Sequence, residues 1–280
     1  MIYKYSNYIV VGSGSFTNLC AKFLKDSKFK VTLVESNFEL NQKCNGFSSR
    51  NNIPYLSFNN RKELTNFLVS INYPTLIVSA ANRYLFPQSV IKKINIDIIN
   101  YHASILPKYP GRNSEAWAIF NGDTEGGISW HKVSKEVDAG ELLDQCKVEI
   151  NESTTSLSLL KKYNQLSLES FKESIKKISL NSLILTKQDF ANRNNIYYSW
   201  MRPDDGILNL ENDELKISRF LRSYDYGLFK NLGNFKVLNK ENILSEAYEY
   251  AIHDKLDFRP KFKNSLTIEK ETKIFEIVII

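Results

Sequence analysis

Residues 8–100 alternate short apolar runs with helical stretches, and this alternation constrains the fold more than any other feature of the sequence. The helical stretches are Ser15–Lys25 and Arg61–Ile71, and each apolar run has a length that suits one buried strand. These runs are Tyr8–Gly12, Lys30–Glu35, Thr75–Ser79 and Ile94–Asn100, with a short extended piece at Ile53–Phe58. Strands that alternate with helices form a parallel sheet covered by helices. The sequence therefore predicts an α/β fold: a Rossmann-like, mostly parallel sheet with helices on both faces.

The rest of the chain predicts a second, smaller part. Gly126–Val133 and Glu141–Ile150 resemble a strand pair, and Ser153–Ile178 a long helix. Beyond about residue 195 the segments become short and rich in aromatic and charged residues, with a strong turn at Pro203–Gly206 and a strand-like end at Ile274–Ile280. We expect a joint near residue 193, with an N-terminal domain at 1–192 and a small C-terminal subdomain of β-hairpin character at 193–280.

Composition narrows the class of protein. The apolar runs are far shorter than the roughly 18 residues of a membrane span, and Met1–Asn7 lacks the pattern of a signal peptide. The 3 cysteines form no CxxC motif or Cys/His cluster, so we expect reduced thiols, a cytoplasmic location and no metal. The net charge of +6 comes from scattered lysines, which favours a solvated surface, then a small anionic substrate, and least a nucleic-acid track.

A first candidate site is the turn Gly12-Ser13-Gly14 after the first strand. Its glycines allow a tight turn into a helix whose N-terminal amides bind anions. Glu35 ends the next strand, about 20 residues further on, where a dinucleotide-binding fold places its acidic residue. Thr17 stands where that fingerprint has its third glycine. Dinucleotide binding, anion binding and a purely structural turn therefore all remain open.

A second candidate site is more specific. Asn100 and His102 lie two residues apart at the end of a strand, so their side chains leave on the same face. Open α/β sheets place their chemistry at this end of the strands. Pro107, Pro110 and Gly111 predict an irregular loop beside it, and Asp138 precedes a glycine in a later loop, where it could orient and charge His102.

An amide, an imidazole and a carboxylate without an evident serine or cysteine nucleophile favour direct transfer between two bound substrates. Each residue alone has a plainer interpretation: Asn100 and Asp138 as turn formers, and His102 as a buried core histidine. Their combination favours a catalytic role.

The run from Asn100 to Gly140 resembles the catalytic core of the 10-formyltetrahydrofolate-dependent formyltransferases. The shared features are an Asn-x-His pair, a Ser-x-Leu-Pro-x-Tyr-x-Gly loop and a downstream Asp-x-Gly, and the order of elements is similar from residue 8 to about 180. The resemblance implies that Asn100, His102 and Asp138 are catalytic, supported by Ser104 and His131. It also implies 10-formyltetrahydrofolate as co-substrate.

The same resemblance implies the binding residues. The stretch Ser79–Pro87 matches the segment that cradles the folate ring, and the loop before Asp138 closes the other side. An Asn82-Arg83 pair departs from the more usual aromatic or glycine-containing stretch. The expected folate-binding residues are Arg83, Leu85, Phe86, Val137 and Asp138. The turn of Gly12, Ser13 and Gly14 matches one that binds a substrate phosphate in some members, and Ser104 and Tyr109 join the expected substrate site.

Three acceptor classes are consistent with this resemblance: a nucleotide-linked amino sugar, initiator aminoacyl-tRNA and a purine precursor. The purine enzymes resemble only the first domain, so the extra C-terminal residues of this chain disfavour a purine precursor. Those C-terminal residues also lack the clustered cations that binding a tRNA backbone requires. Aromatic faces stack nucleobases and arginines suit a diphosphate, so the expected nucleotide-sugar residues are Trp200, Arg202, Arg222 and Tyr224. The pattern is similar to sugar N-formyltransferases that use dTDP-amino sugars for surface polysaccharide, which implies a homodimer without nucleic-acid or membrane partners. A tRNA formyltransferase and a non-catalytic binding module remain the alternatives.

Overall fold

The structure is a computed structural model of the chain, and it describes residues 5–36, 44–229, 231–238, 244–263 and 265–279. The chain forms two compact units. The first comprises Met1–Pro110, Gly127–Lys147 and Tyr163–Asn195, and the second comprises Gly111–Gly126, Val148–Lys162 and Ile196–Ile280. The joint expected near residue 193 adjoins the last of these boundaries. Two earlier segments also belong to the second unit, so neither unit is continuous in the sequence.

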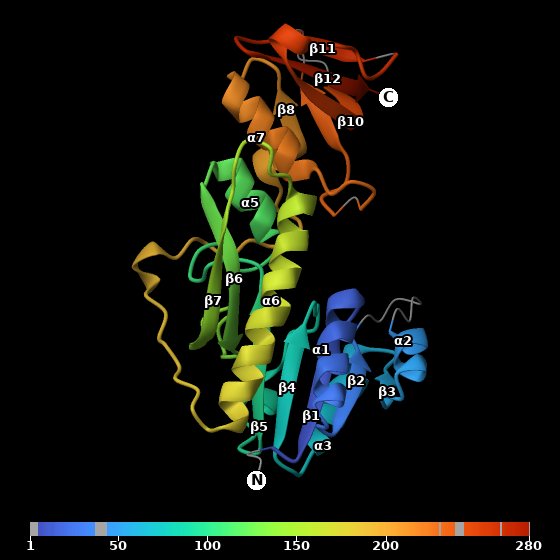
Figure 1. Cartoon of the computed structure of the whole chain (residues 1–280), viewed down its shortest axis with the longest axis vertical. Coiled ribbons are helices and arrows are strands. Elements are labelled where there is room, and N and C mark those ends of the chain that lie inside the picture. The colour runs from blue at the N-terminus through green and yellow to red at the C-terminus, as the bar shows by residue number, and fades with distance from the viewer. Residues whose placement is uncertain (1–4, 37–43, 230, 239–243, 264, 280) are drawn as a thin grey trace. The chain divides into compact units, whose positions relative to one another are not determined.

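A seven-stranded sheet forms the centre of the first unit, with the strand order β3-β2-β1-β4-β5-β6-β7 (Figure 1). Its strands are β1 (Asn7–Gly12), β2 (Val31–Glu35), β3 (Tyr55–Ser57), β4 (Thr75–Ala80), β5 (Ile96–His102), β6 (Glu125–Lys132) and β7 (Leu142–Glu149). Strands β1 to β5 pair in parallel, and β6 pairs with β5 antiparallel. The predicted mostly parallel sheet is confirmed.

Helices cover both faces of this sheet. They are α1 (Ser15–Asp26), α2 (Asn45–Arg50), α3 (Arg61–Ser70), α4 (Gln88–Ile91) and α6 (Ser156–Ser179). Leu64 and Leu68 of α3 pack on Ile9 and Val11 of β1 within one buried cluster. Helices α1 and α6 lie over the opposite face (Figure 1). Short helices α2 and α4 were not expected, because one or two turns carry too few residues to show a helical period.

Aromatic rings fill the face under α1 and α6. The Trp130 ring lies 5.1 Å from that of Phe171 and 6.3 Å from that of Phe16, and its indole N–H donates to the carbonyl of Ser167 at 3.0 Å. Trp130 is fully buried, so this bond satisfies a donor that would otherwise be costly. The packing fixes β6, the strand that also carries His131.

The second unit contains a five-stranded sheet in the order β11-β12-β10-β9-β8. Its strands are β8 (Ile207–Asn209), β9 (Phe235–Leu238), β10 (Leu244–Asp254), β11 (Leu266–Glu269) and β12 (Lys273–Ile279). β12 pairs antiparallel with both β10 and β11, which confirms the predicted hairpin character. Helices α5 (Ser114–Asn121) and α7 (Glu214–Tyr224) belong to the same unit.

Helix α7 buries one face in the core of the second unit. Ile217, Phe220, Leu221 and Tyr224 have the helical spacing i, i+3, i+4, i+7, and all four are buried. The Asp213 carboxylate caps the helix by accepting a hydrogen bond from the Lys216 amide at 2.7 Å. The sequence therefore contains a complete helix signal at a segment where a nucleotide site was expected.

A buried carboxylate anchors the loop between β10 and β11. Glu276 of β12 is fully buried and accepts hydrogen bonds from the Lys261 amide at 2.8 Å and the Ser265 hydroxyl at 3.1 Å. Its carboxylate also lies 2.6 Å from the His253 ring. Burial alone would raise the pKa of Glu276, but the hydrogen bonds from Lys261, His253, Ser265 and the Phe262 amide outweigh it and lower the pKa.

The lowered pKa of Glu276 predicts that the second unit is less stable in acid than at neutral pH. A carboxylate whose pKa is depressed in the fold stabilises it above the unfolded value, about 4.3 for glutamate, and that contribution disappears as the pH falls through the folded value. We expect Glu276→Gln to lower the melting temperature at pH 7 and to differ less from wild type near pH 3. Thermal melts across this range measure the difference. A gap between the two proteins that does not change with pH would contradict the prediction.

Candidate active site

The carboxyl ends of β1, β4 and β5 meet at one edge of the first unit's sheet. Gly12 pairs with Ala80 across β1 and β4, and Ser79 pairs with Asn100 across β4 and β5. The strand order reverses direction between β1 and β4, which is the crevice where open α/β sheets bind their ligands. Both candidate sites of the sequence lie at this edge.

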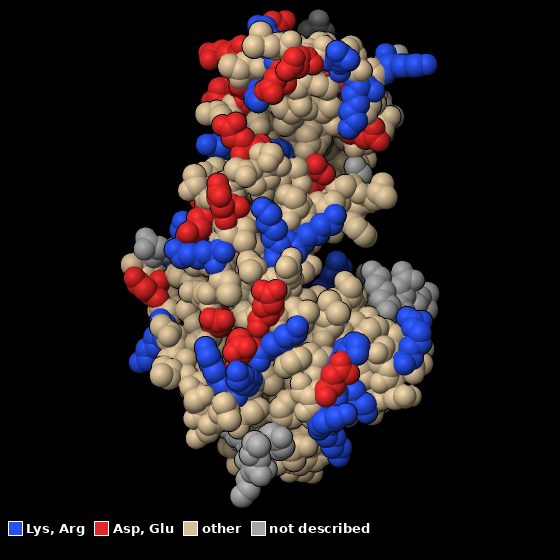
Figure 2. Space-filling model, viewed as in Figure 1, with Lys and Arg blue, Asp and Glu red and all other residues tan. Residues whose placement is uncertain are grey.

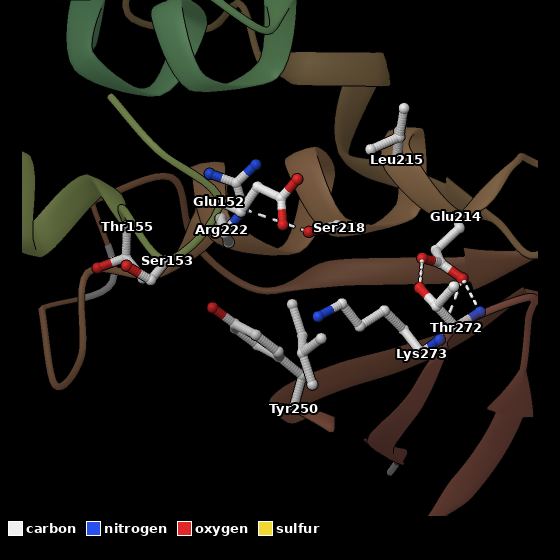
Figure 3. Close-up of a pocket in the computed structure, with 11 residues that line it drawn as sticks. Glu152, Ser153, Thr155, Glu214, Leu215, Ser218, Arg222, Tyr250, Thr272 and Lys273 are labelled. Atoms are coloured by element: carbon white, nitrogen blue, oxygen red, sulfur yellow. Dashed lines mark hydrogen bonds between the residues drawn. The ribbon is translucent and has the colours of Figure 1, made fainter. Parts of the chain in front are cut away.

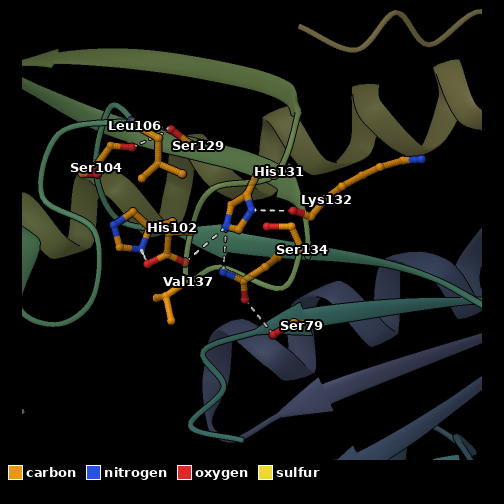
Figure 4. A network of polar contacts seen from close by, with 12 residues as sticks. Ser79, His102, Ser104, Leu106, Ser129, His131, Lys132, Ser134 and Val137 are labelled. Carbon is orange, nitrogen blue, oxygen red and sulfur yellow. Dashed lines mark hydrogen bonds and ion pairs between the residues drawn. The ribbon is translucent and has the colours of Figure 1, made fainter. Parts of the chain in front are cut away.

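Asn100 is held near the end of β5 by bonds to both ends of its amide, within the polar network that includes Ser79 and His131 (Figure 4). Its Oδ1 accepts from the Ser79 hydroxyl at 2.7 Å, and its Nδ2 lies 3.1 Å from Nε2 of His131. Nδ1 of His131 lies 2.8 Å from the Lys132 carbonyl, so we assign the proton to Nδ1 and the acceptor role to Nε2. One amide hydrogen of Asn100 thus goes to His131, and the other remains to be donated.

His102 is buried, with an oxygen acceptor at each ring nitrogen. Its Nε2 lies 2.8 Å from the carbonyl of Tyr109, and its Nδ1 lies 3.5 Å from Oδ2 of Asp138. Both nitrogens can donate at once only when the ring carries two protons. Because Nε2 bonds to Tyr109, a hydrogen bond from it to a reacting oxygen requires that this proton be shared.

Asp138 lies between the two imidazoles. Its other oxygen, Oδ1, is 3.4 Å from Nε2 of His131, and its side chain is 11% exposed. Its backbone has φ of 50°, the left-handed region that residues with a side chain seldom adopt. The structure thus brings Asn100, His102 and Asp138 together, as the sequence predicts, and places His131, which the resemblance implies as a supporting residue, beside Asn100 and Asp138.

This arrangement suits chemistry on a carbonyl group. It offers an amide donor, a protonatable ring and a carboxylate that holds the ring, within a mostly buried cluster where electrostatic interactions are stronger than in water. An amide and an imidazole can stabilise a developing oxyanion, and the ring–carboxylate pair can hold or move a proton.

The loop after β4 carries three of the expected folate-binding residues. Leu85 is 69% exposed, Arg83 is also exposed, and the Phe86 ring packs edge-on against Tyr84 at 5.1 Å. Asn82 shapes the loop: its amide donates to the Ser79 hydroxyl and to the Tyr84 carbonyl, each at 3.0 Å. The unusual Asn82 therefore has a structural role that connects this loop to Asn100 through Ser79.

The turn after β1 is packed tightly at its first glycine. A Cβ on Gly12 would lie 1.8 Å from the Ala80 carbonyl, whereas one on Gly14 would meet nothing within 4 Å. The Thr17 hydroxyl donates to that same carbonyl at 2.6 Å. Gly12 and Thr17 thus join β1 and α1 to β4, which gives a structural reason for the residue that interrupts the dinucleotide fingerprint. Ser13 and Gly14, both half-buried, lead into α1.

Glu35, the acidic residue at the end of β2, has a structural partner near this turn. It is buried, and its carboxylate accepts from the Cys44 amide at 2.9 Å. Its other oxygen, Oε1, has no hydrogen-bond partner among the described residues. The acidic residue expected at the end of β2 therefore serves, at least in part, to fix the chain near Cys44.

Ser104 and Tyr109 shape the loop beside His102. Both are buried, and the Ser104 hydroxyl donates to the Lys108 carbonyl at 2.5 Å. Ser129 of β6 donates to the Ser104 carbonyl at 2.7 Å and accepts from the Leu106 amide at 3.0 Å. In this structure both expected substrate residues brace the loop, and Tyr109 meets His102 through its carbonyl.

The residues expected to bind a nucleotide sugar all lie in the second unit, in different environments. Trp200 is 72% exposed and stacks on Tyr198 with the ring centres 4.6 Å apart and the planes 3° from parallel. Arg202 is exposed and lies beside Gly233. Trp200 therefore has an accessible ring.

Tyr224, by contrast, is a core residue, which corrects the expected role. Its ring stacks on Phe220 at 4.6 Å and meets Phe235 edge-on at 5.6 Å, and its hydroxyl donates to the Pro203 carbonyl at 3.1 Å. Burial raises the pKa of its phenol. No ring face is left for a nucleobase.

Arg222 lines a cavity of about 550 Å³ in the second unit (Figure 3). It is buried, which lowers the pKa of its guanidinium, and it donates to the Thr154 carbonyl at 2.9 Å, the Asn151 carbonyl at 3.2 Å and the Ser218 hydroxyl at 3.2 Å. These bonds tie α7 to the start of α6. Lys273 also lines the cavity, but so do two carboxylates, so the lining has no net charge that would select a diphosphate.

The described residues contain neither a candidate metal site nor a candidate membrane-spanning helix. In that part of the chain, no cluster of three or more His, Cys, Asp or Glu side chains has a geometry that could hold a metal ion. No helix within the described ranges combines the length and the apolar character needed to cross a bilayer.

Comparisons with known proteins identify the family of the chain. Residues 7–175 match the model of the family described as Formyl transferase, which is more than half of the chain. The chain therefore belongs to the formyl transferase family, and it is a formyltransferase.

Relatives within the family differ in their acceptors. The chain is 30% identical to a methionyl-tRNA formyltransferase of Malacoplasma penetrans over 232 residues, which cover 81% of this chain and 70% of that protein. It is 31% identical to a GDP-perosamine N-formyltransferase of Brucella melitensis over 150 residues, 54% of this chain and 56% of that protein. Among solved structures, an N-formyltransferase of Helicobacter canadensis, crystallised with folinic acid and dTDP-3-aminofucose, has the same fold with a TM-score of 0.75 over 100% of both chains at 16% identity.

Proposed function

We propose that the protein transfers a formyl group from 10-formyltetrahydrofolate to the amine of a dTDP-linked amino-dideoxyhexose. The cluster of Asn100, His102 and Asp138 at the ligand-binding edge of the sheet carries the proposal, because its donors and its proton-holding pair suit attack on a formyl carbon. Family membership supports the reaction type.

The proposed reaction proceeds by direct attack. The free amine of the sugar forms a bond to the formyl carbon, and the carbonyl oxygen becomes an oxyanion. The remaining amide hydrogen of Asn100 and the Nε2 proton of His102, shared with the Tyr109 carbonyl, stabilise that oxyanion. Asp138 holds His102 in position and stabilises its cationic form. The bond from the carbon to folate N10 then breaks, and the proton lost by the amine passes to N10.

Three observations support a sugar acceptor. The chain shares its fold over its entire length with the Helicobacter canadensis protein, whose ligands include a dTDP-amino sugar. A sugar 3N-formyltransferase solved with dTDP also shares the fold, with a TM-score of 0.68 over 98% of this chain. The second unit offers the exposed Trp200, whose open ring face suits a nucleobase.

Initiator tRNA is the alternative acceptor, and the Malacoplasma relative favours it. Binding a phosphate backbone requires clustered cations. Figure 2 shows Lys and Arg interleaved with Asp and Glu on the visible face, which favours the smaller acceptor. A non-catalytic binding module is disfavoured because all three polar residues of the cluster are retained and in contact with the residues that orient them.

We expect dTDP to raise the melting temperature by roughly 5 °C when present at about 100 times its dissociation constant, since a ligand that binds only the folded state stabilises it by about 2.7 kcal/mol under that condition. A thermal-shift titration with dTDP, UDP and GDP measures this effect and identifies the base.

The accompanying assay incubates the protein with 10-formyltetrahydrofolate and a panel of dTDP-3-amino and dTDP-4-amino sugars, and mass spectrometry detects a product heavier by one formyl group. No dTDP shift together with formylation of initiator methionyl-tRNA would replace the proposed acceptor by tRNA.

A further inference from the structure

A segment after α6, Thr186–Asn194, runs alongside the loop that carries Asp138, and we name it the strap. It begins with a two-way backbone bridge: the Leu142 amide donates to the Thr186 carbonyl at 2.7 Å, and the Thr186 amide donates back at 3.0 Å. The strap and this loop both belong to the first unit. The bridge fixes where the strap starts relative to the loop.

Gln188 then joins the strap to the backbone of the loop that carries Asp138. It is 9% exposed, and its Nε2 donates to the Asp138 carbonyl at 2.9 Å and to the Gly140 carbonyl at 2.7 Å. Its amide must point its nitrogen at the loop, because the reverse orientation would set an oxygen against two carbonyls. Its Oε1 is buried and has no partner among the described residues.

The backbone that Gln188 holds is a strained one. Asp138 has φ of 50°, a conformation that costs a non-glycine residue roughly 1–2 kcal/mol. Such a conformation persists only where the surroundings fix it. Gln188 holds the carbonyl of Asp138 and that of Gly140, two residues later, and the Arg193 guanidinium donates to the Val137 carbonyl, one residue earlier, at 2.6 Å.

The far end of the strap reaches the other side of His102. Oδ1 of Asn194 accepts from the Tyr109 amide at 3.1 Å, and the carbonyl of Tyr109 lies 2.8 Å from Nε2 of His102. The strap therefore holds the backbone of the two residues that supply the oxygen acceptors beside the His102 ring, Asp138 and Tyr109.

We propose that Gln188 and Asn194 are positioning residues for formyl transfer, which set the orientation of His102 through Asp138 and through Tyr109. The inference rests on the proposed roles of His102 and Asp138. If the strap served only to stabilise the fold, loss of its bonds would lower the melting temperature and leave turnover unchanged. If the strap instead positions the catalytic residues, loss of its bonds lowers turnover even in protein that is fully folded.

The test compares Gln188→Leu and Asn194→Leu with wild type in the formylation assay, well below each protein's melting temperature. We expect kcat to fall about 10- to 100-fold, the effect of misplacing a catalytic group by about 1 Å, with KM for 10-formyltetrahydrofolate within roughly threefold. Asn194→Asp keeps the acceptor oxygen and should restore most of the rate. Lys187→Ala, an exposed neighbour in the strap, is the matched control and should leave kcat unchanged.

A double-mutant cycle separates the inference from the function on which it rests. If Gln188 acts through Asp138, Gln188→Leu should cost little further activity in an Asp138→Ala background. Equal losses in both backgrounds, or a wild-type kcat in Gln188→Leu and Asn194→Leu while Asp138→Ala is impaired, would overturn the positioning role. A wild-type rate in Asp138→Ala would instead refute the proposed mechanism itself.

Discussion

Replacing Asp138 or His102 by alanine is expected to lower kcat for formyl transfer by about two orders of magnitude or more, the scale of a lost oxyanion donor or acid–base group. The two residues form one unit, since Oδ2 of Asp138 lies 3.5 Å from Nδ1 of His102. Among the described residues, removing the carboxylate leaves the ring with its hydrogen-bond contact to Tyr109 alone. The double variant should therefore lose much less than the product of the two single losses.

Steady-state rates of formylation measure these losses, with melting curves to establish that each variant folds. His253→Ala is a suitable comparison, because it removes a histidine from an even closer carboxylate contact, 2.6 Å from Glu276, at the C-terminal sheet. It should lower stability and leave kcat unchanged. A rate within threefold of wild type in either Asp138→Ala or His102→Ala would show that the cluster does not perform the proposed chemistry.

The sequence predicted the sheet and the polar cluster because both depend on local patterns. Apolar runs set the strands, and the spacing of Asn100 and His102 at the end of β5 places both side chains at the same edge. His131, which the resemblance to the formyltransferases implies as a supporting residue, lies opposite Asn100 in the antiparallel register of β5 and β6. Strand period therefore predicts the shared edge of Asn100 and His102, whereas the pairing that brings His131 beside them depends on the fold.

The strap could not be predicted, because nothing local marks it. Gln188 lies 50 residues from the carbonyl of Asp138 to which it donates, and Asn194 lies 85 residues from the amide of Tyr109. A polar residue in a connecting segment carries no signal of such a partner. The direction of a long-range side-chain bond depends on the folded path of the backbone, which the composition of the segment does not determine.

The error at Tyr224 has a different origin. Aromatic residues beside arginines have the same composition in a nucleotide site and in the buried face of a helix, and only the period distinguishes them. Phe220 and Tyr224 lie four residues apart on α7 and stack on each other in the core. Trp200 lies outside any helix or strand, and its ring remains exposed.

Replacing Gly12 by alanine is expected to destabilise the protein by roughly 1–3 kcal/mol, because the new methyl group would lie 1.8 Å from the Ala80 carbonyl of the neighbouring central strand. For a chain of this size the melting temperature should fall by about 5 °C. The matched control is Gly46→Ala in α2, where the nearest atom to the new methyl group is 3.5 Å away at the flexible end of Arg50, and where alanine favours the helix. Differential scanning calorimetry of the two variants compares them directly. An unchanged melting temperature in Gly12→Ala would show that the turn tolerates a side chain, and the glycine would then have to be explained by a ligand that approaches the backbone.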